Sequence, residues 1–204
     1  AESLVDLVSA IVWSVDNDVD VISHSLGWVT EGIGDGNGPA AYLADYAAAN
    51  GILFVDAAGN KTAGQIYNGL WADTDSDGWH DFASGVEVIE LDQVAALDVI
   101  TVSLVWDDWS KGFATESTND YDLHLVRADA FGNWSIVASS DDWQPTIPAP
   151  REEITYITPS AGNYGIAVLK WGSAAPKAFR LTSRGGHKFS SYSSSSSTIV
   201  PPSD

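Results

Sequence analysis

The apolar positions of the first sixty residues follow two different patterns. From residue 3 to residue 16 they recur at spacings of three and four, which predicts an amphipathic helix. Segments 19–25 and 52–57 are almost continuously apolar, which is typical of buried strands. Pro39 begins a second helical segment, and Gly51 ends it. The order helix–strand–helix–strand predicts a parallel sheet that is covered on both faces.

Alternation with a period of two begins further along the chain. Between residues 85 and 183, short runs place apolar side chains on one face and polar side chains on the other, with no clear helix. The clearest runs contain Ile100, Tyr121 and Tyr164, and turn sequences rich in Gly and Asn separate them. About seven strands at this spacing predict an antiparallel β-sandwich or jelly roll.

The charge of the chain limits its partners. The 204 residues include nine Lys and Arg against 28 Asp and Glu, which gives a formal net charge of −19. So few cations disfavour binding to nucleic acid or to an anionic membrane surface, and we expect neither partner. The excess of carboxylates suits calcium, which prefers oxygen ligands. The absence of Cys excludes a disulfide scaffold and a thiol nucleophile.

A first calcium site is predicted near residue 75. Asp73, Asp75 and Asp77 alternate before Gly78, and Asp81 follows. Alternate carboxylates can curl around one ion, and the glycine permits the sharp turn that this requires. The last ligand position of an EF-hand is not acidic here and no helices flank the loop, so we do not expect an EF-hand. A solvated acidic turn is the alternative interpretation.

A second calcium site is predicted from Asp107, Asp120 and Asp122. Asp120 and Asp122 alternate on one face of a predicted strand, and Asp107 follows the strand before it. Like charges so close together are unfavourable unless they are hydrated or bridged by a cation. Calcium is therefore the expected cofactor of the β-rich region.

The ends of the two apolar strands carry the most specific motifs. Residues 23–27 read Ser-His-Ser-Leu-Gly, and residues 56–60 read Asp-Ala-Ala-Gly-Asn. This pair resembles the subtilisin-like serine proteases, in which the two strands end in Ser-Leu-Gly and Ala-Ala-Gly-Asn. The resemblance implies that Asn60 supplies the oxyanion hole, whereas a turn residue is the alternative. It also implies that a polypeptide substrate binds along Ser25, Leu26, Gly27, Ala57, Ala58 and Gly59.

The resemblance does not extend to the catalytic triad. The chain contains no Asp-Ser/Thr-Gly, His-Gly-Thr or Gly-Thr-Ser motif. No Gly-Thr follows His24. It lies in the predicted specificity strand and could touch substrate, although a packed or rim histidine is the simpler interpretation. The chain is therefore expected to be a fragment of a secreted, extracellular serine endopeptidase that is inactive alone, with its triad outside these residues. Its incomplete α/β sheet is expected to promote self-association.

The rest of the chain resembles a second type of domain. Residues 73–82 and 119–125 are similar to the pre-peptidase C-terminal domains of bacterial secreted proteases. Residues 198–201 resemble the segment that follows the oxyanion Asn in subtilisin-like proteases, so the sandwich is expected to be inserted into a surface loop, which tolerates long insertions. The expected organisation is a partial subtilisin-like α/β segment (1–65), an inserted β-sandwich (66–188) and a Ser-rich linker that returns to the α/β domain (189–204).

Two other functions remain open from the sequence. The β-rich region could be a calcium-dependent carbohydrate- or protein-binding module that takes no part in catalysis. Its tryptophans suit stacking on sugar rings, although packing in the core of a sandwich is the simpler interpretation. The insert could also be purely structural and brace the substrate cleft.

Overall fold

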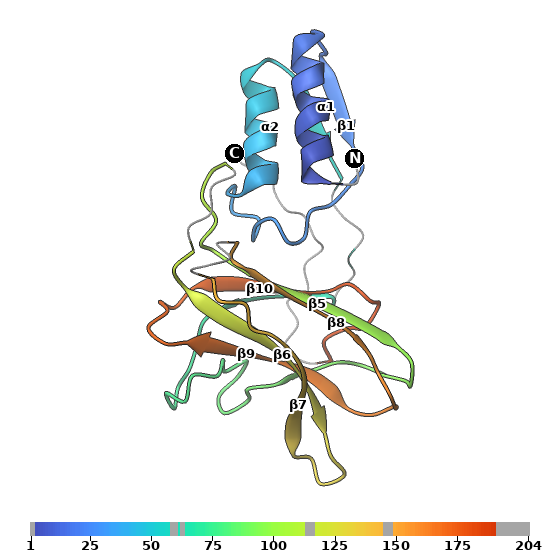
Figure 1. Cartoon of the computed structure of the whole chain (residues 1–204), viewed down its shortest axis with the longest axis vertical. Coiled ribbons are helices and arrows are strands. Elements are labelled where there is room, and N and C mark those ends of the chain that lie inside the picture. Colours follow the sequence, from blue (N-terminus) through green and yellow to red (C-terminus); the bar gives the residue numbers. More distant parts are fainter. Residues whose placement is uncertain (1–2, 58–60, 62–63, 113–116, 145–148, 191–204) are drawn as a thin grey trace.

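The computed structural model describes residues 3–57, 61, 64–112, 117–144 and 149–190. It has a small α/β part and a larger part made of two antiparallel sheets, and the two helices lie at the far end from the sheets (Figure 1). None of the described helices is long and apolar enough to cross a membrane. In chain order, the α/β part contains α1 (Leu4–Asp16), β1 (Val21–His24), α2 (Pro39–Ala49) and β2 (Leu53–Asp56).

The α/β part follows the predicted order of elements. Ser3 begins α1 with a capping box, in which its hydroxyl accepts a hydrogen bond from the backbone N–H of Asp6 at 3.2 Å. Strands β1 and β2 pair in parallel, as the sequence predicts, with Val21 opposite Leu53 and His24 opposite Asp56. The helices and strands share a small core of Leu7, Ile11, Leu43, Ala47 and Ile52.

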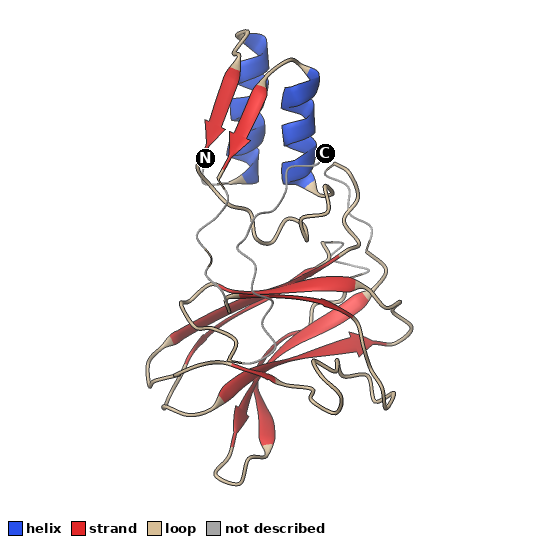
Figure 2. Ribbon diagram, turned by 180° about the vertical axis from the view of Figure 1, so that it is seen from behind, coloured by secondary structure: helices blue, strands red, loops and turns tan. Residues whose placement is uncertain are grey.

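The two-stranded sheet is covered on one face only. Both helices lie on the same side of β1 and β2 (Figure 2). On the other side Val21, Leu53 and Val55 are 53%, 61% and 47% exposed. The prediction of a sheet covered on both faces is therefore wrong for the described residues, because two helices on one side leave the opposite apolar face bare.

The larger part, which we call the two-sheet body, comprises the described residues from 64 to 190. All its strand pairs are antiparallel, as the sequence predicts. The first sheet has the order β3-β10-β5-β8, formed by β3 (Ile66–Leu70), β10 (Ala178–Ser183), β5 (Val99–Trp106) and β8 (Arg151–Ile157). The second has the order β4-β9-β6-β7, formed by β4 (Ile89–Glu90), β9 (Tyr164–Trp171), β6 (Asp120–Ala128) and β7 (Trp134–Ser140).

The two sheets enclose one hydrophobic core. The inward face of β5 consists of Ile100, Val102, Leu104 and Trp106, all fully buried, as its period-two pattern predicts. Residues from the second sheet complete this core, and Phe189, beyond the last strand, is buried in it as well. Ordered packing therefore continues slightly past residue 188, the predicted end of this region.

Strand β6 departs from simple alternation. Asp120, Asp122 and His124 point away from the core residues of the strand, yet each is less than one-tenth exposed. The Trp79 ring lies 5.1 Å from the His124 ring, and Trp79 also forms a bridge with Leu169 of the neighbouring strand. The loop before β4 thus covers the outer face of this sheet, which an alternating pattern does not reveal.

The two parts of the molecule touch through specific contacts. The backbone N–H of Gly38, at the start of α2, donates to the carbonyl oxygen of Ser110 at 3.0 Å. Lys111 forms an ion pair with Asp45 on α2 at 3.2 Å. The segment that follows β5 therefore reaches the α/β part and joins it to the two-sheet body.

Candidate functional site

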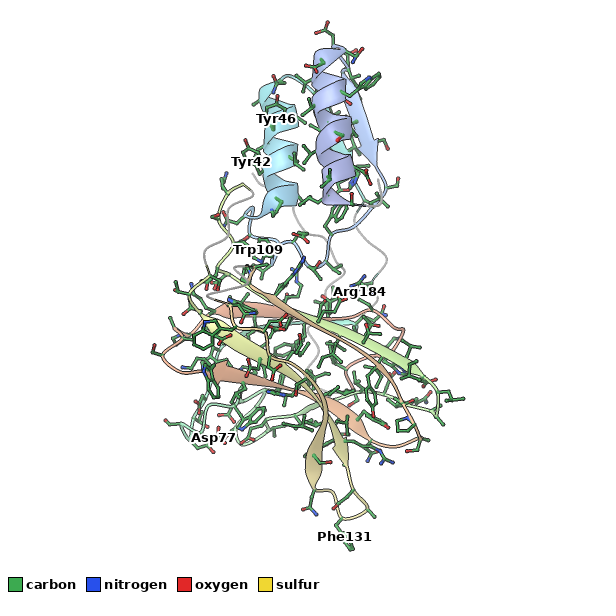
Figure 3. The ribbon with its side chains drawn as sticks, in the orientation of Figure 1. Tyr42, Tyr46, Asp77, Trp109, Phe131 and Arg184 are labelled. Atoms are coloured by element: carbon green, nitrogen blue, oxygen red, sulfur yellow. The ribbon has the colours of Figure 1, made fainter. Side chains whose placement is uncertain are left out.

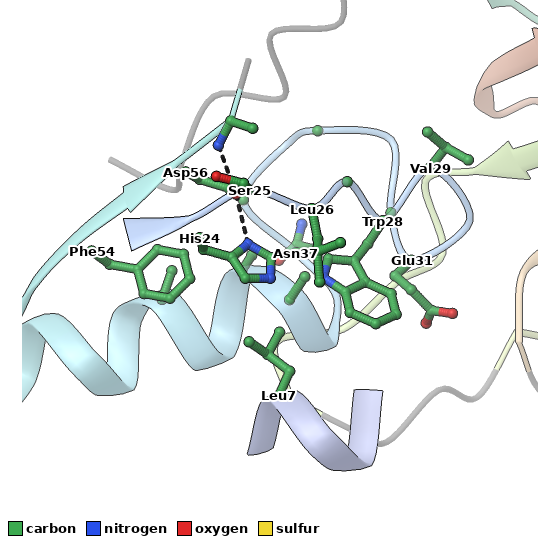
Figure 4. Close-up of a pocket in the computed structure, with 18 of the residues that line it drawn as sticks. Leu7, His24, Ser25, Leu26, Trp28, Val29, Glu31, Asn37, Phe54 and Asp56 are labelled. Atoms are coloured by element: carbon green, nitrogen blue, oxygen red, sulfur yellow. Dashed lines mark hydrogen bonds and ion pairs between the residues drawn. The ribbon is translucent and has the colours of Figure 1, made fainter. Parts of the chain in front are cut away.

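A cavity of about 330 Å³ lies at the carboxyl ends of β1 and β2 (Figure 4). Both strands end at this edge because they are parallel, and the loop after β1 forms the opposite wall. Leu7, Ala40 and Phe54 give the cavity a largely apolar lining. The arrangement suits a ligand that brings an apolar stem and a few polar atoms.

The residues predicted to bind substrate divide into two groups. Four of them line the cavity, namely Ser25, Leu26, Gly27 and Ala57. At Gly27 a Cβ atom would meet no heavy atom within 4 Å, so a ligand could approach the backbone there. Ala58, Gly59 and Asn60 lie outside the described residues, and their roles stay predictions.

A histidine–aspartate pair joins the ends of the two strands. Nδ1 of His24 lies 2.7 Å from Oδ1 of Asp56, and the same oxygen accepts the backbone N–H of Ala57 at 2.8 Å. Figure 4 shows both interactions beside the Phe54 ring, whose centroid lies 5.5 Å from that of His24. His24 is only 8% exposed. His24 is therefore a packed residue that also lines the cavity.

Two cationic side chains reach the cavity from the junction with the two-sheet body. Nζ of Lys61 donates to the carbonyl oxygen of Ser183 at 3.1 Å. Burial, followed by the nearby Arg184, lowers the pKa of Lys61. Arg184 itself pairs with Glu153, and Figure 3 shows it on the side of the body that faces the helices. Both cations line the cavity together with the carboxylates of Glu31 and Asp56.

Comparison with protein families identifies the relatives of this chain. The model of the subtilase family, peptidase S8, matches residues 3–200. The chain belongs to the subtilase family. The match begins before the first strand motif and continues past the two-sheet body, so it spans both parts of the molecule. No curated protein matches the sequence.

The solved structures that match this chain are distant in sequence. The CspB protease of Clostridium perfringens is 14% identical, with 88% of this subtilase chain and 38% of that chain covered and a TM-score of 0.48. The pre-peptidase C-terminal domain of a collagenase from Bacillus anthracis is 13% identical, with 61% of this chain and 91% of that chain covered and a TM-score of 0.37. This subtilase chain therefore spans well under half the length of the clostridial protease.

The first predicted calcium loop brings three of its four carboxylates together. Oxygen atoms of Asp73, Asp75 and Asp77 all lie within 4.8 Å of one another. The backbone N–H groups of Ser76 and Gly78 donate to the two carboxylate oxygens of Asp73, at 2.7 Å and 3.2 Å. These hydrogen bonds fold the loop back on itself, and this brings the alternate carboxylates close together.

Asp81 is held differently from the other three. Its Oδ2 accepts hydrogen bonds from the backbone N–H of Thr74 at 2.7 Å and from the Thr74 hydroxyl at 2.5 Å. These hydrogen bonds lower the pKa of Asp81. In this arrangement Asp81 braces the loop rather than joining the three clustered carboxylates.

The residues of the second predicted calcium site have different partners in the structure. Asp107 lies 3.8 Å from Nζ of Lys177, which is also 2.5 Å from Asp108. Burial, followed by the charges of Asp120 and Asp141, raises the pKa of Asp122 to about 6. Asp120 and Asp122 therefore share an environment with Asp141, whereas Asp107 has a cationic partner.

A buried glutamate that the sequence analysis missed lies beside this group. Glu152 of β8 is 2% exposed, and its carboxylate accepts hydrogen bonds from the Ser140 hydroxyl and, at 2.5 Å, from Nε2 of Gln144. Burial raises the pKa of Glu152 to about 7, and the charges of Asp142 and Asp122 act in the same direction. Glu152 stands two residues before the buried Ile154, on the same face of β8. This alternation was the sequence signal that could have identified it.

Proposed function

We propose that this subtilase chain is a segment of a secreted serine endopeptidase and forms part of its substrate cleft. The observation that carries the proposal is the cavity at the ends of β1 and β2, lined by Ser25, Leu26, Gly27 and Ala57. A polypeptide substrate would lie along the backbone of these four residues as an added strand. Asn60 would donate its side-chain amide to the oxyanion of the tetrahedral intermediate.

The organisation of the chain is part of the same proposal. Residues 1–65 belong to the peptidase domain, residues 66–188 form an inserted β-sandwich of the pre-peptidase type, and residues 189–204 return to the peptidase domain. The contacts of Gly38 and Lys111 with the other part support an insert that rests against the cleft side of the domain. The nucleophile, the base and its orienting carboxylate come from other parts of the parent protein.

We further propose that the sandwich binds calcium at the loop of Asp73, Asp75 and Asp77. The clustered oxygens supply the hard ligands that this ion prefers. Asp81 would stabilise the loop through its hydrogen bond with the backbone of Thr74. A second ion is proposed at Asp120 and Asp122, whose closeness raises the cost of ionising both. The lysine contact of Asp107 favours a structural role for this carboxylate over ligation.

An assay of peptide hydrolysis by the isolated chain tests whether the catalytic triad lies outside these residues. Loss of one triad member removes most of the rate of such an enzyme, and here all three are expected elsewhere. The isolated chain should therefore hydrolyse neither casein nor a short chromogenic peptide. Turnover that a serine-directed phosphonate abolishes would contradict this proposal.

A second candidate function is calcium-dependent binding of carbohydrate or protein by the two-sheet body. Trp143 and Trp171 are 52% and 53% exposed, and Trp171 lies opposite Asp120 across the β6–β9 pair. Exposed indole rings stack readily on sugar rings. A glycan array probed with the chain, with and without calcium, separates this function from a role confined to the peptidase.

A further inference from the structure

Three of the side chains that line the cavity can only donate hydrogen bonds, and a fourth, His24, can donate through Nε2 when its ring is protonated. Nε2 of His24 and Nε1 of Trp28 are buried, and neither has a hydrogen-bond partner among the described residues. The indole N–H can only donate, and the same holds for the ammonium of Lys61 and the guanidinium of Arg184. A ligand that satisfies this wall must therefore bring acceptors.

The carboxylates in the same wall are already engaged. Glu31 pairs with Arg151 at 2.5 Å, and Asp56 pairs with His24 at 2.7 Å. Of the two cations, Arg184 pairs with Glu153, whereas Lys61 donates to a backbone carbonyl. Burial, followed by the charge of Arg184, lowers the pKa of Lys61. An anion in the cavity would relieve the repulsion between these two cations.

The Asp56 contact fixes how His24 can meet a ligand. A carboxylate only accepts hydrogen bonds, so Nδ1 of His24 carries a proton and Nε2 is the ring atom left for the ligand. When the imidazole is protonated, Nε2 becomes a charged donor, and a second carboxylate at this position stabilises that state from the other side. The pair is therefore arranged to hold a carboxylate between His24 and the cations at the rim.

We propose that His24 is a specificity-determining residue and that this cavity accepts a peptide carboxylate. The carboxylate is carried either by an acidic side chain of the substrate or by the free carboxyl terminus of a cleaved peptide. The apolar wall at Leu7, Leu26 and Phe54 holds the methylene groups that precede it. This inference rests on the proposed peptide cleft and adds the chemical class of the group that the cleft selects.

Binding of four matched peptides to the chain tests the inference by titration calorimetry. Three carry blocked termini and differ only in a central Glu, Gln or Leu, and the fourth has the central Leu with a free carboxyl terminus. The Glu peptide should bind at least about tenfold more tightly than the Gln peptide, the scale of one charge-assisted hydrogen bond. The fourth peptide shows whether a terminal carboxylate is accepted as well.

His24→Gln is the decisive variant, because it keeps an amide donor but cannot become a cation. It should lose most of the preference for the Glu peptide over the Gln peptide, whereas His187→Gln, in the two-sheet body and outside the cavity lining, should keep the wild-type preference. The ring signals of His24 in the wild-type NMR spectrum should shift when the Glu peptide is added. That last readout needs no variant to fold.

Each outcome of these titrations decides the inference. Equal binding of the Glu, Gln and Leu peptides overturns carboxylate selection but leaves the peptide cleft in place. A preference for Glu that survives undiminished in His24→Gln overturns the role of that residue. Failure of every peptide to bind overturns both this inference and the proposed cleft.

Discussion

At the scale of single residues, the most consequential feature is a set of buried groups whose charge is only partly compensated. His24 lies in contact with Asp56, and Asp108 forms an ion pair with Lys177. Glu152 and Asp122, in contrast, receive neutral hydrogen bonds or face other acids, and burial raises the pKa of both. These two carboxyl groups should therefore tie the stability of the two-sheet body to pH.

Glu152→Gln should stabilise the calcium-free chain at neutral pH. The pKa of Glu152 is raised from 4.5 to about 7 in the fold, so the native state holds a proton that the unfolded chain has lost. That contribution is complete below the unfolded pKa and disappears as pH rises through the folded one. Removing the carboxylate should add on the order of 1–3 kcal/mol at about pH 8 and little at about pH 5.

Urea unfolding with a chelator present, at both pH values, measures this difference. Glu153→Gln is the matched control, because the neighbouring glutamate is exposed and pairs with Arg184. It should leave the pH dependence as in the wild type. If Glu152→Gln loses stability equally at both pH values, the buried carboxyl group serves only through its hydrogen bonds.

At the scale of elements, the loop that carries Asp73, Asp75 and Asp77 should respond to calcium. An ion that binds only the folded form stabilises by about 2.7 kcal/mol at a hundredfold excess over its dissociation constant. Asp75→Ala should remove most of the rise in Tm that calcium produces. The variant Asp16→Ala changes the charge equally at an exposed position outside this loop, and its response should be normal.

Differential scanning calorimetry with calcium or chelator makes this comparison. Asp122→Ala tests the second proposed ion in the same way and should weaken whatever response Asp75→Ala leaves. A melting curve of the wild type that chelator does not move would remove both metal proposals.

The same scale shows what the sequence could and could not predict. Helix α1 and strand β5 were predictable, because one apolar face with a regular period leaves a local signature. The neighbours of β10 were not, since it pairs with β3 and β5 over long stretches of chain and no local pattern records the choice. The burial of Glu152 could have been inferred from the alternation of β8, but its partners Ser140 and Gln144 belong to other segments and leave no local signal.

At the scale of the whole molecule, the two parts should differ in stability. The core of the α/β part is small, and Val21, Leu53 and Val55 leave its sheet with an exposed apolar face. We expect self-association through this face and faster hydrogen exchange in α1 and β1 than in β5 and β6. Leu53→Ser should weaken the association by removing an exposed apolar side chain without entering the core.

Sedimentation velocity and hydrogen exchange of the isolated chain test this expectation. Leu97→Ser, which removes a leucine that is 77% exposed on the two-sheet body, is the control and should associate like the wild type. A monomer at all concentrations, with α1 and β1 as protected as β5 and β6, would mean that the bare sheet face is stable in water.

The central claim is that this chain supplies part of the catalytic cleft of a subtilase. Its most direct test is kcat and Tm of Asn60→Ala in the full-length parent enzyme, with Asn50→Ala, at the end of α2, as the control. Asn60→Ala should lower kcat about 10²–10³-fold, the range for loss of one oxyanion-hole donor in a subtilisin, while KM and Tm change little. An Asn60→Ala enzyme with unchanged kcat, or one that loses Tm while kcat stays normal, would contradict the claim.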